Sequence, residues 1–284
     1  MLEIPESNTV AQQLNQTVKG KTIQNVTAGH SPHKFAWYCG DPQDYHALLA
    51  GRQIDSSSAL AGQVEIRAGG CSILFSDGVN LRYLAAGEEL PKKHQLLIEF
   101  EDFSHLVSTV QMYGGLCAFR DGQYDNPYYL VAKEKPSPLS DAFDERYFQS
   151  LCSCPGFSKL SAKAFLATEQ RIPGLGNGVL QDILWNAKIH PKRKMGELTD
   201  SELGTMFRAV RDTLMEMTIK GGRDTERDLF GCLGGYRSVL SKNTVDRPCP
   251  ACGAAIQKEA YLGGSIYYCP GCQKYEKQPK QQAV

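Results

Sequence analysis

The most informative stretch of this chain is residues 163–191, KAFLATEQRIPGLGNGVLQDILWNAKIHP. Its centre, PGLGN at 173–177, separates two segments whose apolar residues recur at three- and four-residue steps, as on the buried face of a helix. Pro173 ends the first helix, and Gly174 and Gly176 give the backbone freedom to turn back and to lie close to another molecule. The pattern predicts two helices joined by a tight glycine-rich turn.

The start of the second helix is a candidate phosphate site. Asn177 stands where a helix N-cap is expected, and unpaired N–H groups and the helix dipole attract anions there. An ordinary helical hairpin with a glycine-rich corner explains the same pattern. The basic run Lys192, Arg193 and Lys194 follows this helix. It is either a solvated surface run or a contact for a second phosphate strand.

Length and composition indicate a two-domain globular protein. The 284 residues contain no apolar stretch near the ~18 residues that suggest a membrane span, and the start lacks a signal-peptide pattern. We therefore expect a soluble, cytoplasmic protein. Residues 1–135 carry 11 basic and 15 acidic residues, a net charge of −4, whereas residues 136–284 carry 20 and 16, a net of +4. This distribution places any phosphate-binding face in the C-terminal half.

The pattern of short elements predicts an α+β protein. Closely spaced strands with hairpin turns in the first half indicate an antiparallel sandwich or barrel, whereas the second half is helical. Asp77 and Gly78 are expected to form one of the turns, and Thr199 with Glu202 a capping box. The predicted strands are 22–28, 62–67, 72–76, 80–84, 94–100 and 106–111; the predicted helices are 6–19, 41–51, 141–153, 158–170, 178–187 and 199–219.

Four of the ten cysteines have the spacing of a metal site. Cys249 and Cys252 form one CxxC pair, Cys269 and Cys272 form another, and 16 residues separate the pairs. Two such knuckles close a tetrahedral thiolate site, so we expect one structural Zn²⁺ per chain. Four thiolates leave no open coordination position, which excludes a catalytic metal there. The hairpin between the pairs serves either as a protein–protein contact or as a nucleic-acid contact.

Several motifs together resemble the formamidopyrimidine-DNA glycosylase / endonuclease VIII family. They are the opening MLEIPES, the spacing of Lys163 and Asn177 around PGLGNG, and the closing CPAC…YYCPGCQK. The resemblance implies an N-terminal antiparallel β-sandwich with a flanking helix, and a C-terminal helix–two-turns–helix domain with a four-cysteine zinc finger. The implied segments are a sandwich domain at 1–132, a linker at 133–140, the helical domain at 141–240, the zinc finger at 241–275 and a polar tail at 276–284.

The resemblance also implies an activity and its residues. Members of the family excise damaged bases from duplex DNA and cleave abasic sites, using an N-terminal amine that forms a Schiff base. Glu3 aligns with the family's general acid/base and Glu6 with its second glutamate. Lys163 and Asn177 would contact the DNA backbone, and the hairpin at 253–268 would also reach DNA. We expect a monomer, associated with the nucleoid when bound to DNA.

Three positions depart from the family pattern. The family has proline as its second coded residue, whereas this chain has Leu2, so that Met1 must supply the amine. The family has a lysine on a turn of the sandwich, and the corresponding stretch here, residues 68–71, includes no basic residue. The family also has a phosphate-binding arginine, and Gly264 stands at that position in this chain. Two interpretations stay open: a glycosylase and abasic-site lyase, or a nucleic-acid-binding protein that kept the DNA-binding scaffold and lost excision. A structural role in a larger assembly, through the zinc finger, is a third.

Overall fold

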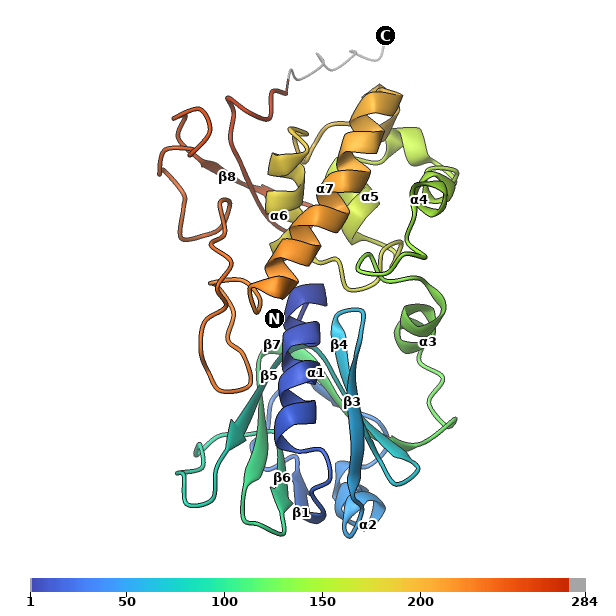
Figure 1. Cartoon of the computed structure of the whole chain (residues 1–284), viewed down its shortest axis with the longest axis vertical. Coiled ribbons are helices and arrows are strands. Elements are labelled where there is room, and N and C mark those ends of the chain that lie inside the picture. Colours follow the sequence, from blue (N-terminus) through green and yellow to red (C-terminus); the bar gives the residue numbers. More distant parts are fainter. Residues whose placement is uncertain (1, 276–284) are drawn as a thin grey trace. The chain divides into compact units, whose positions relative to one another are not determined.

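The computed structural model describes residues 2–275 (Figure 1). Met1, the predicted nucleophile, and the tail predicted at 276–284 lie outside the described residues. Within 2–275 no helix is both long enough and apolar enough to cross a membrane.

The described residues form two compact units. The chain passes from one unit to the other more than once, so the segment boundaries predicted at 132, 140 and 240 stay predictions. The first unit contains the residues up to Ser137, Pro173–Leu175 and Leu214–Arg237; the second contains Pro138–Ile172, Gly176–Thr213 and the residues from Ser238 onward.

Within the described residues, the first unit is built on a seven-stranded sheet of order β1-β6-β7-β5-β4-β3. Neighbouring strands are antiparallel, except that the short β2 pairs in parallel with β7. The two longest strands, β5 and β7, pair along their whole length and so join the two halves of the sheet. The strands are β1 (Ile23–Ala28), β2 (Ala36–Tyr38), β3 (Ile54–Leu60), β4 (Gln63–Ala68), β5 (Cys71–Leu84), β6 (Leu96–Phe100) and β7 (His105–Arg120).

Strand β5 runs through the dipeptide that was predicted to be a turn. The register against β7 shifts between Asp77 and Val79, which marks a β-bulge and not a hairpin. Asp77 has φ +58, and a Cβ on Gly78 would overlap the carbonyl oxygen of Tyr113. The prediction of two strands at 72–76 and 80–84 was therefore wrong, because a bulge uses the same residues as a tight turn.

One core joins both halves of the sheet to helix α1 (Ile4–Thr17), which packs against β3 and β4 (Figure 1). Val10 and Leu14 supply the apolar stripe of α1 and are almost fully buried. Burial of such a side chain contributes about 1.5–3 kcal/mol. Leu229, from the loop after the last helix, enters the same core and is held by hydrogen bonds to Gln13 and Tyr83.

Three elements of the first unit were not predicted. Helix α3 (Pro127–Glu134) begins after Asn126, whose side chain accepts a hydrogen bond from the N–H of Tyr128, and it extends into the predicted linker. Strands β2 and β3 were missed because they are short or serine-rich and largely exposed at one face. The predicted helix at 41–51 is shorter, a 3₁₀ turn (Pro42–Asp44) followed by α2 (Tyr45–Leu49).

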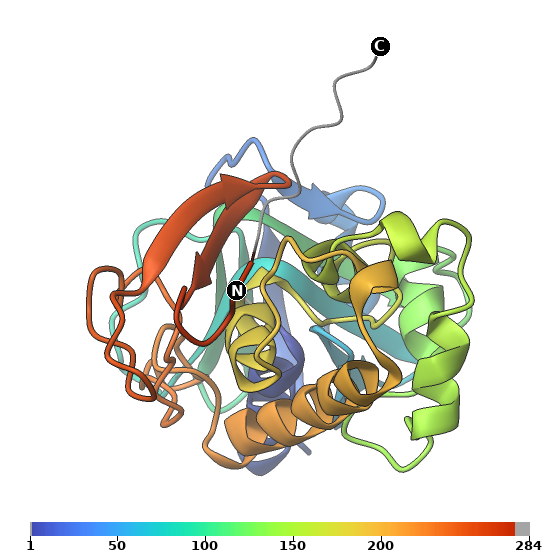
Figure 2. The same cartoon turned by 90° about the horizontal axis from the view of Figure 1, so that it is seen from above.

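The second unit contains helices and the β8–β9 hairpin (the red arrows in Figure 2). The predicted helices are confirmed in position, but the first two are shorter. Ser161 caps α5 by accepting from the N–H of Ala164, and the chain becomes extended at Thr168. Thr199 and Glu202 make the predicted capping box. The elements are α4 (Glu145–Leu151), α5 (Ala162–Ala167), α6 (Asn177–Asn186), α7 (Asp200–Ile219, which continues into the first unit), β8 (Gln257–Tyr261) and β9 (Gly264–Tyr268).

Candidate active site and metal centre

The two predicted glutamates lie at the start of α1. Glu3 is the N-cap residue, with an extended backbone, and Glu6 is in the first turn; both are almost fully buried. Pro5 occupies one of the first helical positions, where its missing N–H costs nothing. A helix start stabilises negative charge, so this position favours two carboxylates.

Arg223 is the partner of these carboxylates, and it was not predicted. Its Nε and Nη2 each donate to Glu6 at 2.9 Å, and its backbone N–H donates to Glu6 Oε1 at 3.1 Å. Nη2 also lies 3.6 Å from Oε2 of Glu3. Burial lowers the pKa of Arg223, but the charges of Glu3 and Glu6 outweigh this and raise it overall. The guanidinium therefore stays charged inside the protein.

The loop that carries Arg223 is fixed by close backbone contacts. Gly222 has φ +93, a conformation that L side chains rarely adopt, and its carbonyl accepts a hydrogen bond from the N–H of Tyr236 at 3.0 Å. A Cβ on Gly234 would overlap that same carbonyl. The loop thus holds Arg223 next to Glu6 by its backbone as well as by its side chain.

The sheet brings Asp77 and Tyr113 into the neighbourhood of the N-terminal residues. The N–H of Leu2 donates to the carbonyl of Asp77 at 2.7 Å. Burial raises the pKa of the Asp77 carboxyl. The pKa of Tyr113 is raised mainly by burial and, to a smaller extent, by the charges of Asp77 and Glu3. The charges of Glu3 and Asp77 thus act on the same tyrosine.

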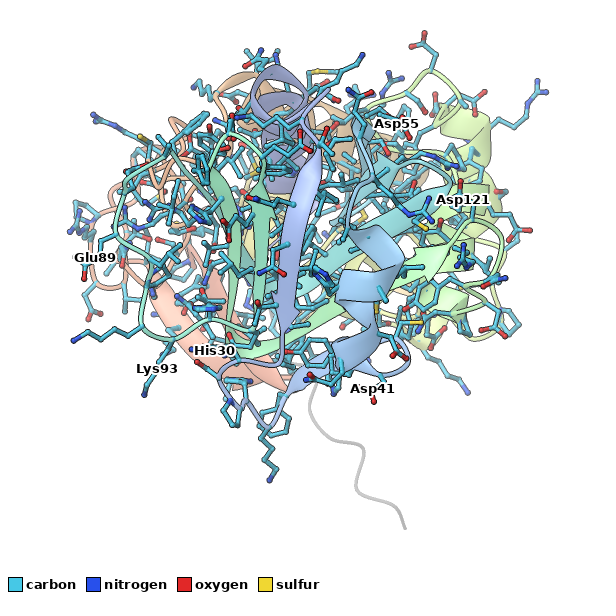
Figure 3. All side chains as sticks on the ribbon, turned by 90° about the horizontal axis from the view of Figure 1, so that it is seen from below. His30, Asp41, Asp55, Glu89, Lys93 and Asp121 are labelled. Atoms are coloured by element: carbon cyan, nitrogen blue, oxygen red, sulfur yellow. The ribbon has the colours of Figure 1, made fainter. Side chains whose placement is uncertain are left out.

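The sandwich turn beside the N-terminal residues carries no lysine. This turn is Ala61 and Gly62: a Cβ on Gly62 would lie 3.2 Å from the carbonyl oxygen of Leu2. The turn at 68–71, which the sequence analysis matched to the family's lysine-bearing turn, lies at the other end of β4. Arg67, next to that turn, forms an ion pair with Asp121 at the surface, where Figure 3 labels the aspartate.

Lys163 and Asn177 lie together against the β8–β9 hairpin. Lys163 Nζ donates to the carbonyl of Tyr261 at 2.7 Å, and burial lowers the pKa of its amine. The Asn177 side chain donates to the carbonyl of Ser265 at 3.0 Å, and its Oδ1 is buried without a hydrogen-bond partner among the described residues. A Cβ on Gly264 would lie 3.5 Å from Lys163 Nζ and 3.8 Å from Asn177 Nδ2.

The predicted cap differs from expectation, and Arg193 of the basic run is ion-paired within the chain. Gly176 is the N-cap of α6, and Asn177 is the first helical residue, because the Asn177 side chain bonds to the hairpin and not to its own helix. The guanidinium of Arg193 pairs with Glu202 and donates to the carbonyl of Glu197 at 3.0 Å. This ion pair fits a structural surface run, and the contact of Arg193 with a second phosphate strand stays a prediction.

The four cysteines converge on one point. Their sulfur atoms all lie within 4.8 Å of one another, with 3.8 Å between Cys249 and Cys272 and 3.3 Å between Cys252 and Cys269. Four sulfurs at about 2.3 Å from a tetrahedral metal ion would be separated by similar distances. The cluster can therefore hold a metal ion. Gln273 accepts from the N–H of Cys269 at 2.9 Å and donates to the carbonyl of Ile189 at 3.0 Å, which ties the cluster to the end of α6.

Comparisons with known proteins agree with this architecture. Residues 135–228 match the family described as the formamidopyrimidine-DNA glycosylase H2TH domain. The formamidopyrimidine-DNA glycosylase of Listeria monocytogenes is 27% identical over 281 residues, covering 96% of this chain and 100% of the relative. The enzyme of that name from Chloroflexus aurantiacus is 26% identical over 298 residues, covering 99% and 100%. These matches support membership of the formamidopyrimidine-DNA glycosylase / endonuclease VIII family.

Solved structures of this family share the fold. The MutM (Fpg) protein of Thermus thermophilus superimposes with a TM-score of 0.79 at 25% identity, covering 95% of this chain and 98% of that one. Lactococcus lactis Fpg in complex with abasic-site DNA gives a TM-score of 0.80 at 23% identity, covering 96% and 100%. The predicted fold class, an N-terminal β-sandwich followed by a helix–two-turns–helix domain, is confirmed.

Within this family framework, the predicted site residues fall into separate groups. Glu3 and Glu6 are brought together in the first unit, whereas Lys163 and Asn177 are brought together in the second. Arg223 is the residue that the sequence analysis missed. The glycine pair before it signals a tight loop, but nothing in the local pattern indicates that the loop reaches the start of α1.

Proposed function

We propose that this family member is a base-excision-repair DNA glycosylase with abasic-site lyase activity, acting as a monomer on damaged or abasic duplex DNA. The observation that carries the proposal is the buried Glu3 carboxylate at the start of α1, beside a charged Arg223. A carboxylate in such a place is suited to moving protons near the N-terminal amine. The relatives that match over their full length are formamidopyrimidine-DNA glycosylases, which supports the same activity.

The lyase reaction uses the amine as its nucleophile. α-Amino groups have a pKa near ~7.7–8.0, so a useful fraction is unprotonated at neutral pH. The nitrogen attacks C1′ of the ring-opened abasic sugar, and loss of water from the adduct gives a Schiff base. Removal of a C2′ proton then expels the 3′ phosphate by β-elimination. Glu3 accepts and returns these protons, and Met1 supplies the amine because Leu2 stands where the family has proline.

DNA is bound through the second unit in this proposal. Lys163 and Asn177 present cationic and amide donors beside the start of α6, and the β8–β9 hairpin lies against both. Such donors suit the phosphates of a DNA backbone. We propose that the cysteine cluster binds Zn²⁺, because an ion held by four thiolates would keep the hairpin in its folded form.

The alternative, a family member that binds DNA without excising bases, has specific support. Neither residues 68–71, which compare with the family's lysine turn, nor Gly264, beside Lys163, provides the cation that the family pattern has. Each missing charge-assisted hydrogen bond to phosphate removes about 1.5–3 kcal/mol of binding. We therefore expect slow reaction at preformed abasic sites and weak excision of oxidised bases, because an abasic site needs no base flipping.

Borohydride trapping distinguishes the two functions. The native chain and an N-terminally acetylated form are incubated with an abasic duplex and with an oxidised-base duplex in the presence of borohydride. The proposal expects a covalent complex on the abasic duplex that acetylation abolishes and Glu3→Gln diminishes. No trapped complex on either duplex, with DNA binding intact, would establish the alternative. Trapping that survives acetylation would exclude the N-terminal amine.

A further inference from the structure

The guanidinium of Arg223 is buried between two carboxylates of the first unit. Glu6 receives hydrogen bonds from Nε, Nη2 and the backbone N–H of Arg223, at 2.9, 2.9 and 3.1 Å. Glu3 lies within ion-pair distance of the same guanidinium, at 3.6 Å from Nη2. All three residues are at most 4% exposed, so their charges interact at a lower effective dielectric constant than at the surface.

The two carboxylates are engaged differently. Glu6 accepts two side-chain hydrogen bonds from the planar fork of Arg223, which fixes the position and plane of the guanidinium. The contact between Arg223 and Glu3 is longer and is an ion pair without this bidentate geometry. Glu6 therefore holds the guanidinium, and the guanidinium acts on Glu3 through its charge.

Other titratable side chains of the described residues act on this cluster. The charges of Asp77 on β5 and of Glu3 both act on Tyr113 on β7, and the charge of Glu226 on the loop acts on Arg223. Removal of the Arg223 charge would favour the protonated form of Glu3, because burial and the neighbouring Glu6 carboxylate both disfavour a second negative charge.

We propose that Arg223 is a positioning residue of this site: held by Glu6, it keeps Glu3 ionised and oriented as the proton acceptor of the lyase reaction. This inference rests on the proposed function, which supplies the protons that Glu3 moves. It assigns to Glu6, which the family resemblance gave only as the second glutamate of the site, the role of holding Arg223.

The charge of Glu3 can be measured without turnover. Carboxyl ¹³C resonances of the full-length protein, labelled at glutamate, are titrated with pH, and Glu3→Gln assigns the signal. Arg223→Gln removes the neighbouring positive charge, so the pKa of Glu3 should rise by about 1–3 units. Glu6→Gln removes a neighbouring negative charge while its side-chain oxygen can still accept from Arg223, so the pKa of Glu3 should fall.

Opposite shifts distinguish this role from a structural one, since general loosening of the site would move both variants in the same direction. Arg227→Gln is the matched control: Arg227 is exposed on the same loop and donates to the carbonyl of Gly231 at 2.5 Å. It should leave the Glu3 titration unchanged. Arg223→Lys keeps the positive charge but loses the bidentate fork. The pKa of Glu3 should therefore stay near its value in the parent, whereas kcat for trapping should fall with little change in KM.

The pH profile of trapping gives a second readout. On the acidic side of the profile the amine becomes protonated first, and Glu3 sets the break at lower pH, because it accepts protons only when it is ionised. That lower break should move to higher pH in Arg223→Gln and to lower pH in Glu6→Gln. If the parent traps no DNA, the proposed function fails, and the NMR shifts still decide the role of Arg223. If Arg223→Gln does not fold, the direction of the shift in Glu6→Gln decides it. A Glu3 pKa that is unchanged in Arg223→Gln, or that rises in Glu6→Gln, would overturn the inference.

Discussion

The backbone N–H of Ile4 donates a hydrogen bond to the carbonyl oxygen of Gly174 across 3.2 Å. This bond joins the first residue of α1 to the glycine-rich turn of residues 163–191. Gly174 has φ +76, and a Cβ on it would overlap the backbone nitrogen of Gly62. The turn was predicted to approach another molecule, and at Gly174 it packs against its own chain, directly beside the residues that position Glu3.

Replacing Gly174 should therefore disturb the site through the backbone. Gly174→Ala combines the strain of a left-handed backbone, about 1–3 kcal/mol, with overlap against Gly62. Gly122→Ala is the control, since Gly122 has φ +78 and nothing within 4 Å of a Cβ. Thermal unfolding should show a clearly larger loss of stability for Gly174→Ala. Equal losses would mean that the close approach to Gly62 has no energetic importance.

Lys163 and Asn177 should contribute sequence-independent affinity for DNA. If Lys163 contacts one phosphate, Lys163→Ala should reduce the slope of log affinity against log salt by about 0.9 on duplex DNA. Asn177→Ala should weaken binding to unrelated sequences by similar factors, because it contacts backbone and not base edges. Fluorescence anisotropy over a salt series measures both, with the exposed Lys19→Ala as control. Parent-like binding by both variants at low salt would remove this surface from the DNA-binding assignment.

Gly264→Arg should strengthen DNA binding. The backbone of Gly264 is outside the left-handed region, and a Cβ there makes only ordinary contacts near Lys163 and Asn177. An added guanidinium can form charge-assisted hydrogen bonds to phosphate, worth about 1.5–3 kcal/mol. Gly263→Arg adds the same charge at a neighbouring residue with φ +71, where a side chain is strained. Equal gains in affinity from the two variants would show that net charge alone is responsible.

Removal of one ligand should release the metal and unfold the hairpin. Cys252→Ser leaves three thiolates, and a segment as short as residues 249–272 has little core to keep it folded. Elemental analysis should give one zinc per parent chain and none per variant chain, with faster amide exchange in the hairpin. Cys232→Ser changes an exposed cysteine outside the cluster and should retain the metal. A freshly purified parent without zinc would contradict the proposed ion.

A proline amine should accelerate the reaction. When Met1 is deleted and Leu2 is replaced by proline behind a new initiator methionine, processing leaves an N-terminal secondary amine one residue closer to Glu3. Because a ~1 Å misplacement can cost ~10²-fold in rate, we expect up to about that gain in borohydride trapping on an abasic duplex. The same variant carrying Glu3→Gln should lose most of the gain. No acceleration would show that amine position does not limit the rate.

Local patterns predicted the elements whose formation depends on nearby residues. The periodicity of residues 178–187 gave α6, and the pair Thr199 and Glu202 gave the start of α7. The cysteine spacing predicted the cluster because the CxxC geometry is itself local. These signals succeed because hydrogen bonds and side-chain contacts within a few residues determine the conformation.

Contacts between residues far apart in the sequence could not be predicted from such local patterns. Whether Asp77 and Gly78 form a turn or a bulge depends on the approach of Tyr113, 35 residues later in the chain. The pairing of Arg223 with Glu6 spans 217 residues and depends on the loop fixed by Gly222. The sequence therefore identified Glu3 and Glu6, whereas the group that determines their charge became visible only in three dimensions.

The position of Arg223 late in the chain also determines when the first unit can be completed during translation. A ribosome that has completed residue 137 has produced the whole sheet, but neither Leu229 of its core nor the counter-ion of Glu6. At ~5–20 residues per second, synthesis of the missing segment takes roughly 4–17 s. During that interval the carboxylates of Glu3 and Glu6 lack the guanidinium that pairs with them. Burial of the two charges is then unfavourable, so both carboxylates are expected to stay hydrated. Completion of this unit is thus coupled to translation of most of the second.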